Sequence, residues 1–426
     1  MKVFKFGGAS VKDAKAIRNV AAILSLFKSD NLVVVFSAMG KITNLLERLI
    51  NAYWEASDTA LIIEEFKAFH NEIITDLELT NLSDIIAHYN CLEQKIKTKK
   101  SNNYHFEYDQ IICFGELLST SIISEFLNQS APSNWVDART IIKTNDRWRE
   151  AKVNWNNTEL EYNKQVLPLF SDSCKIVITQ GFIGGTNENL TTSLGREGSD
   201  FTAAIFAFIA NAESVTIWKD VPGMLNADPR IFNGTILLKQ ISFREAIELA
   251  YFGASVIHPK TIQPLKNKEI PLYIKSFLKP KNEGTTIQSS MAYDSKVASY
   301  IFKPNQILFS LQPKDFSFVV EDNLKEIFTT LAELNVRVNL MQNSAVSFSF
   351  LIDDKYELEE LLSAFDQDYN IKYMKPRLSN QEVENIKKSL RKKNYNFTCR
   401  DAPINAYCNR DLCLTKKHGI GNEISA

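Results

Sequence analysis

Residues 3–44 read VFKFGGASVKDAKAIRNVAAILSLFKSDNLVVVFSAMGKITN, and this stretch decides the fold. It holds two short apolar runs, Val3–Phe6 and Leu32–Phe36. Each run ends in a turn of small residues, and each turn leads into a segment with apolar residues at helical spacing. A continuous apolar run is typical of a parallel strand that is buried on both faces. The pattern therefore predicts an α/β fold with a doubly wound, mainly parallel sheet.

The same alternation returns further along the chain. Lys175–Thr179 and Val215–Trp218 are strand-like, and each is followed by a polar or glycine-rich loop. Residues 53–110 contain no proline and are predicted to form a mostly helical insertion. Ligands of doubly wound sheets bind at the carboxyl ends of the strands. The loops expected to carry the chemistry therefore follow Phe6, Phe36, Thr179 and Trp218.

Near residue 290 the pattern changes to a second, smaller unit. Strands and helices now follow in the order βαββαβ, which is a ferredoxin-like arrangement. The expected elements are Gln306–Leu311, Val320–Leu334, Val336–Met341, Ala345–Ile352, Glu357–Phe365 and Ile371–Met374. A small unit placed after a larger one suits a ligand-sensing module. We expect three regions, with boundaries at 1–290, 297–376 and 377–426, the last being a basic, cysteine-rich tail.

The composition is that of a globular protein. Of 426 residues, 45% are hydrophobic and 23% are charged, and the formal net charge is −1. That charge gives no electrostatic reason to expect a nucleic acid or a membrane as a partner. No apolar run approaches the roughly 20 residues that span a bilayer, and the N-terminus lacks the pattern of a signal peptide. We expect a cytoplasmic protein.

The first candidate loop is Lys5–Ser10, KFGGAS. Two glycines after a strand allow backbone N–H groups to approach phosphate oxygens closely, and Lys5 could reach a transferring phosphoryl group as a point charge. The same residues are also consistent with a simple tight turn that binds no phosphate. The sequence contains no G-x-x-x-x-G-K-[ST] phosphate-binding loop. A second turn of small residues and hydroxyls, Ser37–Asn44, suits a phosphate or a small substrate, or an ordinary helix start.

Three further loops carry charges in unusual surroundings. Glu116 lies among apolar and small residues, where a carboxylate needs a cation such as an ammonium group or a structural ion-pair partner. Arg196 lies between glycines and can grip a carboxylate with two hydrogen bonds. Asp200 opens an apolar helix, which it could cap, or it could bind an ammonium group. Lys219 and Arg230 are suitable phosphate partners.

Together these loops resemble the amino-acid kinase family, and within it the aspartate kinases. The segments that carry the resemblance keep the family's order and spacing: Lys5–Ser10, Ser37–Asn44, Gly115–Thr120, Val136–Asp146, Thr191–Ala204, Ile217–Arg230 and Leu249–Pro259. Val319–Ser349 is similar to that family's ACT regulatory domain. The resemblance implies transfer of the γ-phosphoryl group of Mg-ATP to the side-chain carboxylate of L-aspartate, which gives 4-phospho-L-aspartate, the first step toward lysine, threonine and methionine.

The resemblance also implies roles for individual residues. Lys5 and Asp200 would be catalytic. The substrate-binding residues would be Ser37, Thr43, Glu116, Arg196 and Ser199, with Glu116 and Asp200 on the ammonium group and Arg196 on the α-carboxylate. The nucleotide and its Mg²⁺ would lie beside Lys5, Gly7, Gly8, Ser10, Lys219, Asp220, Leu225 and Arg230. The ACT region implies an amino-acid effector, lysine or threonine, and a homodimer.

This chain departs from the family's pattern in several places. Ala9 replaces a usual threonine, Ser255 replaces a frequent lysine, and Leu225 replaces a frequent tyrosine. Lys260 could substitute for the missing lysine. Residues 297–303 read as the first strand of a second ACT unit, but the rest of that unit is not recognisable after residue 375. Because pairing of ACT units usually builds the dimer in this family, a broken second unit could leave a monomer or an unregulated enzyme.

The tail offers one candidate metal site. Cys399, Cys408, Cys413 and His418 supply three thiols and an imidazole, a possible tetrahedral zinc set with irregular spacing. Unliganded cysteines in an altered tail are the alternative. Two other functions stay open for the whole chain. One is a kinase for another amino acid or carbamate, and the other is a non-catalytic or unregulated amino-acid sensor.

Overall fold

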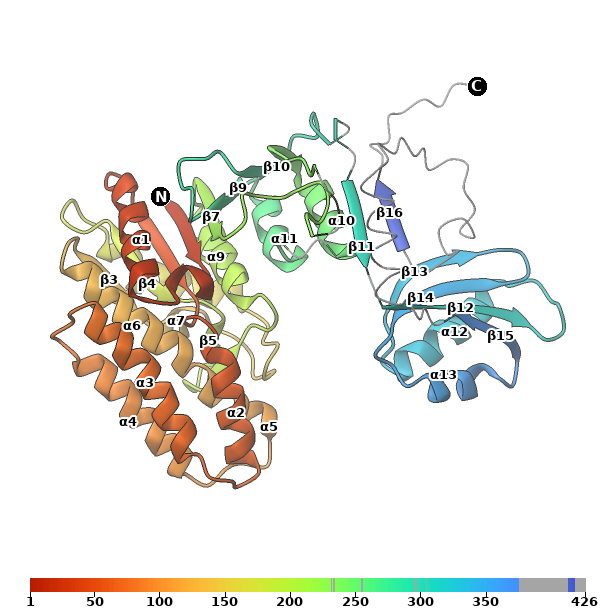
Figure 1. Cartoon of the computed structure of the whole chain (residues 1–426), viewed down its shortest axis with the longest axis horizontal. Helices are drawn as coiled ribbons and strands as arrows, with labels where there is room; N and C mark the ends of the chain where they lie inside the picture. Colours follow the sequence, from red (N-terminus) through yellow and green to blue (C-terminus); the bar gives the residue numbers. More distant parts are fainter. Residues whose placement is uncertain are drawn as a thin grey trace. The chain divides into compact units, whose positions relative to one another are not determined.

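The computed structural model describes residues 1–230, 232, 234–253, 256–294, 296–297, 299–303, 305–374 and 413–417. The chain divides into two units (Figure 1). The first unit consists of Met1–Met224, Leu237–Ala250 and Ser255–Asp294. The second consists of Leu225–Ile236, Tyr251–Ala254 and Ser295–Ala426.

The first unit is built on an eight-stranded sheet in the order β3-β4-β2-β1-β7-β9-β10-β8. The first six strands in this order, from β3 through β4, β2, β1 and β7 to β9, are parallel. Strand β10 is antiparallel to β9, and β8 is parallel to β10. The expected mainly parallel sheet is confirmed. The strands are β1 Lys2–Phe6, β2 Leu32–Phe36, β3 Ser133–Val136, β4 Ile176–Gln180, β7 Ser214–Lys219, β8 Gln240–Ser242, β9 Leu272–Ser276 and β10 Thr285–Gln288, with a separate hairpin of β5 Ile183–Gly185 and β6 Thr191–Ser193.

Helices cover both faces of this sheet because alternate residues of each strand point to opposite sides. Phe4 and Phe6 of β1 lie in the hydrophobic cluster that also contains the apolar faces of α1 to α6. On the other face α9 packs against β1, β2 and β7, and α11 packs against α9. The helices are α1 Ala14–Leu24, α2 Ile42–Trp54, α3 Ala60–Asp76, α4 Ser83–Lys97, α5 Tyr104–Ile112, α6 Phe114–Asn128, α7 Ala138–Ile141, α8 Trp155–Gln165, α9 Gly198–Ile209, α10 Phe243–Phe252 and α11 Pro259–Asn267.

The helical insertion expected over residues 53–110 contains α3, α4 and most of α5, and α6 follows it on the same side of the sheet (Figure 1). The stretch Tyr104–Asn128 is long and apolar enough to cross a membrane by length and composition alone. Its most apolar window is 83% buried inside the protein. We therefore interpret this stretch as a core element of the unit.

The second unit contains a four-stranded antiparallel sheet in the order β13-β14-β12-β15. Its elements are β12 Gln306–Pro313, α12 Glu321–Glu333, β13 Val338–Asn343, β14 Phe348–Asp353, α13 Leu358–Phe365 and β15 Tyr369–Met374. Ile307, Phe309 and Leu311 are buried at every second position of β12, and they pack with residues of both helices. This order of strands and helices confirms the ferredoxin-like prediction.

A separate two-stranded antiparallel ribbon joins β11, Ser299–Lys303, to β16, Cys413–Lys417. Of the strand predicted over residues 297–303, Ser299–Lys303 is present as β11. Lys303 at its end lies 2.9 Å from Asp353 of β14. Of the basic, cysteine-rich tail only Cys413–Lys417 belongs to the described residues. The candidate zinc ligands Cys399, Cys408 and His418 lie outside them, as do Ser255 and the side chain of Cys413.

Candidate active site

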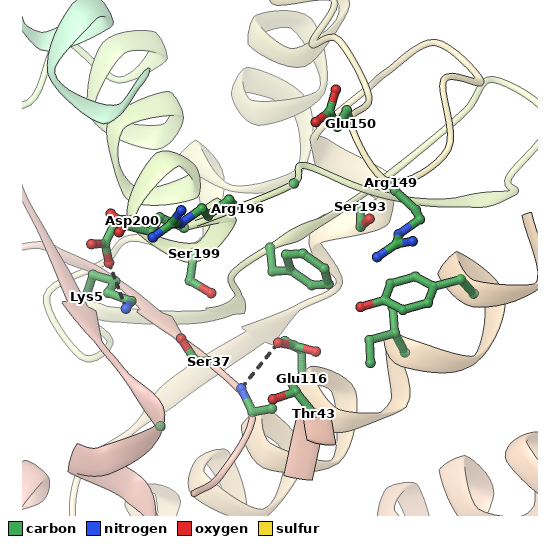
Figure 2. A pocket seen from close by; sticks show the side chains of 18 of the residues that line it. Lys5, Ser37, Thr43, Glu116, Arg149, Glu150, Ser193, Arg196, Ser199 and Asp200 are labelled. Carbon is green, nitrogen blue, oxygen red and sulfur yellow. Dashed lines mark hydrogen bonds and ion pairs between the residues drawn. The ribbon is translucent and has the colours of Figure 1, made fainter. Parts of the chain in front are cut away.

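The first unit contains a cavity of about 830 Å³ beyond the carboxyl ends of β1, β2 and β7, where the sequence placed the chemistry. Figure 2 shows Lys5 and Asp200 together at one end and Arg149 and Ser193 at the other, with Glu116 between. The lining residues are Lys5, Gly8, Ser37, Ala38, Gly40, Thr43, His105, Tyr108, Ile112, Glu116, Arg147, Trp148, Arg149, Glu150, Phe182, Ser193, Gly195, Arg196, Glu197, Gly198, Ser199, Asp200 and Lys219.

One end of the cavity is built around a buried carboxylate held by two lysines. Oδ1 of Asp200 lies 2.7 Å from Nζ of Lys5, and its Oδ2 lies 3.2 Å from Nζ of Lys219. Burial would raise the pKa of Asp200, but the two ammonium groups outweigh burial and lower it. Asp200 also lies in the first turn of α9, where the helix dipole favours a negative charge. The carboxylate therefore stays ionised and aims both lysines into the cavity.

The predicted glycine turn lies beside these lysines. A Cβ at Gly8 would come within 2.7 Å of the Ala38 carbonyl oxygen, so the turns after β1 and β2 approach closely. The N–H of Gly40 donates to the carbonyl oxygen of Gly8 at 3.1 Å and joins the two turns. The buried hydroxyl of Ser10 donates to the carbonyl oxygen of Gly7 at 2.5 Å. Ser10 thus stabilises the turn, while the backbone of Gly8 lines the cavity.

Glu116 places a buried carboxyl group between the two ends (Figure 2). It lies in the first turn of α6, and its Oε1 accepts a long hydrogen bond of 3.4 Å from the N–H of Ala38. Its Oε2 is buried and has no hydrogen-bond partner among the described residues. Burial raises the pKa of Glu116 to about 8. A carboxylate in this state is a site for a cationic group of a ligand.

The predicted substrate residues Ser37, Thr43, Arg196 and Ser199 all line the same cavity. Arg196 is exposed and forms no ion pair with any described acidic residue. It follows Gly195, whose φ of +79° lies in the left-handed region that favours glycine. Ser199 is buried against Gly181, where any Cβ would come within 2.4 Å of the serine Cβ. The loop thus offers a free guanidinium group at the mouth of the cavity.

The remaining predicted nucleotide residues do not line the cavity. Asp220 is an exposed neighbour of Lys219 at the end of β7. Leu225 and Arg230 belong to the second unit, where Arg230 pairs with Asp228 of its own loop at 2.7 Å. Lys260, the possible substitute, donates to the carbonyl oxygen of Leu194 at 2.7 Å. The expected contacts of these side chains with a nucleotide stay predictions.

Sequence reasoning missed one side of the cavity, which α5 and the loop 145–153 provide. The missed residues with polar or aromatic side chains are His105, Tyr108, Arg147, Trp148, Arg149, Glu150, Phe182, Ser193 and Glu197. The run Arg147–Glu150, which places a tryptophan between two arginines directly after the matched segment Val136–Asp146, was the available signal.

A bound nucleotide would have to supply most of the ligands of Mg²⁺ at this site. Among the described residues no group of three or more His, Cys, Asp and Glu could hold a metal ion. Among the described residues that line the cavity, Asp200 is the carboxylate paired with the two lysines. Mg²⁺ in kinases is bound by one or two carboxylates together with phosphate oxygens and water, so this donor set fits.

A model of the "Amino acid kinase family" matches residues 1–276. The chain belongs to this family. Among its relatives is lysine-sensitive aspartokinase 3 of Escherichia coli, which is 33% identical over 360 residues, or 82% of this chain and 78% of that one. The chloroplastic bifunctional aspartokinase/homoserine dehydrogenase 1 of Arabidopsis thaliana is 28% identical over 89% of this chain, which spans 43% of that protein. The resemblance to aspartate kinases is thus confirmed.

The fold of this chain is similar to that of E. coli aspartokinase III in two solved structures. The complex with aspartate and ADP, called the R-state, is 29% identical with a TM-score of 0.71 and covers 88% of this chain and 85% of its own. The complex with lysine and aspartate, called the T-state, is 28% identical with a TM-score of 0.74 and covers 97% and 95%. The alignment therefore includes residues of both units of this chain.

Proposed function

We propose that this family member is an aspartate kinase, which transfers the γ-phosphoryl group of ATP to the side-chain carboxylate of L-aspartate. The observation that carries the proposal is Glu116: a buried carboxylate with one unpartnered oxygen in a cavity that also offers free guanidinium groups and two lysines. L-Aspartate has one ammonium group and two carboxylates, and it complements this set. The related E. coli enzyme has been seen with aspartate and ADP.

In this proposal different groups of the cavity bind the nucleotide phosphates and L-aspartate. Lys5, Lys219 and the Gly8 turn take the phosphates, because ammonium groups and close backbone N–H groups stabilise phosphoryl oxygens. Glu116 takes the ammonium group of L-aspartate and Arg196 its α-carboxylate. Ser37 and Thr43 line the path of the side chain. These clamps place the side-chain carboxylate toward the γ-phosphorus atom.

The nucleophile in this reaction is already ionised at neutral pH, so no strong general base is required. The residues act by orientation and by neutralising charge on the moving phosphoryl group. Asp200 has both oxygens on lysines, and we therefore assign it to orienting Lys5 and Lys219 rather than to the ammonium group. Mg²⁺, held mainly by the phosphates, would add further neutralisation.

We propose that L-lysine regulates the activity through the second unit, and that this unit pairs two chains. Support comes from the ferredoxin-like fold of the unit and from the lysine complex of the related E. coli enzyme. The effector would bind near β13 and the loop Gln312–Phe318. Met341 of β13 and Phe316 and Phe318 of the loop are exposed apolar residues there.

Coupled measurement of ADP release tests the substrate assignment. L-Aspartate should stimulate ADP release from Mg-ATP, whereas L-glutamate and carbamate should not. L-Glutamate is one methylene too long for the spacing of the clamps, and carbamate has neither an ammonium group nor a second carboxylate. Arg196→Ala should raise the KM for L-aspartate and leave the KM for ATP near its wild-type value. Equal stimulation by the other acceptors would reject L-aspartate as the substrate.

A further inference from the structure

Arg149 lines the cavity but has no role in the proposed phosphoryl transfer. Its guanidinium group lies 4.2 Å from the centre of the Tyr108 ring and forms no ion pair with an acidic side chain in the described part of the chain. Its φ is +67°, a left-handed conformation that is uncommon for a residue other than glycine, asparagine or aspartate. Residues held in such conformations cluster at functional sites, because the surrounding structure must enforce them.

The enforcing group is Asp109, a fully buried carboxylate outside the cavity lining. Its Oδ2 accepts the backbone N–H of Arg149 at 2.9 Å and that of Ser193 at 3.0 Å. Its Oδ1 accepts the hydroxyl of Ser193 at 2.6 Å. Asp109 of α5 therefore ties the loop 145–153 to β6, and both tied residues line the cavity.

Neighbouring contacts hold the same loop on either side of Arg149. The ring of Trp148 packs edge-on against Phe106 of α5, with the ring centres 5.0 Å apart. The N–H of Ala151 donates to the carbonyl oxygen of Ser193 at 3.0 Å. The guanidinium group is thus presented by a preorganised loop, and preorganisation of this kind reduces the entropy lost when a ligand binds.

The position of Arg149 indicates which ligand group it meets. It lies at the end of the cavity opposite Lys5, with Glu116 between (Figure 2). A Cβ at Gly195 would come within 3.1 Å of the Arg149 carbonyl oxygen, so its loop touches the loop that carries Arg196. The reacting carboxylate must lie near Lys5. The carboxylate that does not react then lies beyond Glu116, on the side of Arg149.

We propose that Arg149 is a second anchor for the α-carboxylate of the amino-acid substrate, which it would approach from the end of the cavity opposite Asp200 and Arg196 (Figure 2). This inference rests on the proposed function. A planar guanidinium group can donate two parallel hydrogen bonds to a carboxylate, which a lysine cannot reproduce. Two guanidinium groups on the α-carboxylate would make the enzyme select substrates that carry a charge there.

The test compares L-aspartate with its α-amide, L-isoasparagine, in which a neutral amide replaces the α-carboxylate. Dissociation constants for both ligands are measured by calorimetry, and the KM values for L-aspartate and ATP are measured by ADP release. The proteins are wild type, Arg149→Gln, Arg149→Lys and Lys152→Gln. Lys152 is an exposed residue of the same loop outside the cavity lining, so its variant is a control for the charge change.

We expect Arg149→Gln to weaken L-aspartate binding about 10- to 100-fold, the loss typical of a charge-assisted pair. Binding of the α-amide should change less than twofold, and so should the KM for ATP, which also shows that the variant is folded. Arg149→Lys should recover only part of the loss, and Lys152→Gln should behave as wild type. Equal weakening of both ligands, or no weakening of L-aspartate, would overturn the anchor.

The two proposals fail in different ways. A wild-type protein that binds L-aspartate without releasing ADP would reject the kinase function, while the binding data would still decide the role of Arg149. A wild-type protein that releases ADP with L-aspartate, and whose Arg149→Gln variant keeps the wild-type dissociation constant, would reject the anchor alone. Absence of L-aspartate binding to wild type would reject both.

Discussion

At the scale of single residues, Glu116 shows how binding can oppose stability. Its carboxyl group is buried and lacks the partners that would offset its loss of hydration. The pKa of about 8 is the measure of that penalty, since the folded protein keeps the group protonated where the unfolded chain would release the proton. An ammonium group in the cavity would relieve the penalty.

Glu116→Gln should stabilise the protein while removing substrate binding. The raised pKa means that the folded state binds more protons than the unfolded state between the ordinary pKa and about 8, so the free energy of unfolding falls as pH rises through this window. A neutral glutamine avoids the loss. We expect the free energy of unfolding at pH 8 to rise by about 1–3 kcal/mol in urea titrations. A destabilised variant at that pH would contradict this account of the carboxylate.

The same group predicts a pH dependence of the KM for L-aspartate. Only the ionised carboxylate attracts the ammonium group, and the pKa of Glu116 in the free site is about 8. The KM should therefore fall about tenfold for each pH unit as pH rises toward 8 and then level off. Initial rates from pH 6 to 9 at constant ionic strength check this. The KM for ATP is the internal control, and a KM for L-aspartate that does not change with pH would refute the role of Glu116.

At the scale of elements, the site depends on how closely the turns after β1 and β2 approach. Gly8 leaves no room for a side chain, because a Cβ would lie 2.7 Å from one backbone oxygen and 2.9 Å from another. Those oxygens belong to Ala38 and Gly40, which line the cavity. The two turns must therefore move together if either is changed.

Gly8→Ala should separate these turns and weaken nucleotide binding. We expect the KM for ATP to rise at least about tenfold, equivalent to roughly 1.4 kcal/mol, while the protein stays folded because the strands keep their pairing. Ala9→Ser adds one atom at the exposed neighbouring position and should leave the KM for ATP within about twofold. A normal KM in Gly8→Ala would show that the turn does not hold the phosphates.

The sequence predicted the helices and strands better than it predicted the contacts between them. Continuous apolar runs such as Leu32–Phe36 predicted buried parallel strands, and the turns after them predicted where the cavity opens. The reversed strands β10 and β8 were not foreseen, because a strand of three or four residues has no periodicity that reveals its direction. The loop with Arg149 was missed because its place in the cavity depends on Asp109, forty residues earlier in the chain.

The pairing of Asp200 with two lysines shows the same limit at the site. The sequence predicted Lys5, Lys219 and Asp200 as functional residues, but it assigned Asp200 to a ligand. The structure brings both lysines to the two oxygens of this carboxylate. Neighbouring parallel strands place Lys5 and Lys219 at the same edge of the sheet, and this tertiary arrangement has no counterpart in the linear motif.

At the scale of the whole molecule, the two units should communicate through an effector. L-Lysine should lower the rate of aspartate-dependent ADP release, and Met341→Ala should raise the half-inhibitory lysine concentration about tenfold through loss of one apolar contact at β13. Met374→Ala is the matched control, since it removes an exposed methionine from the opposite edge strand, β15. Equal inhibition of wild type and both variants would place the effector elsewhere.

The central claim is tested most directly by trapping the product with hydroxylamine, which converts an acyl phosphate into a hydroxamate. Wild-type protein with Mg-ATP and L-aspartate should form the side-chain hydroxamate of aspartate in step with ADP release. Lys5→Ala should abolish both signals, because the phosphoryl group then loses an ammonium partner that Asp200 aims at it. Folded wild-type protein that binds L-aspartate but forms no hydroxamate would contradict the kinase assignment and favour an amino-acid sensor.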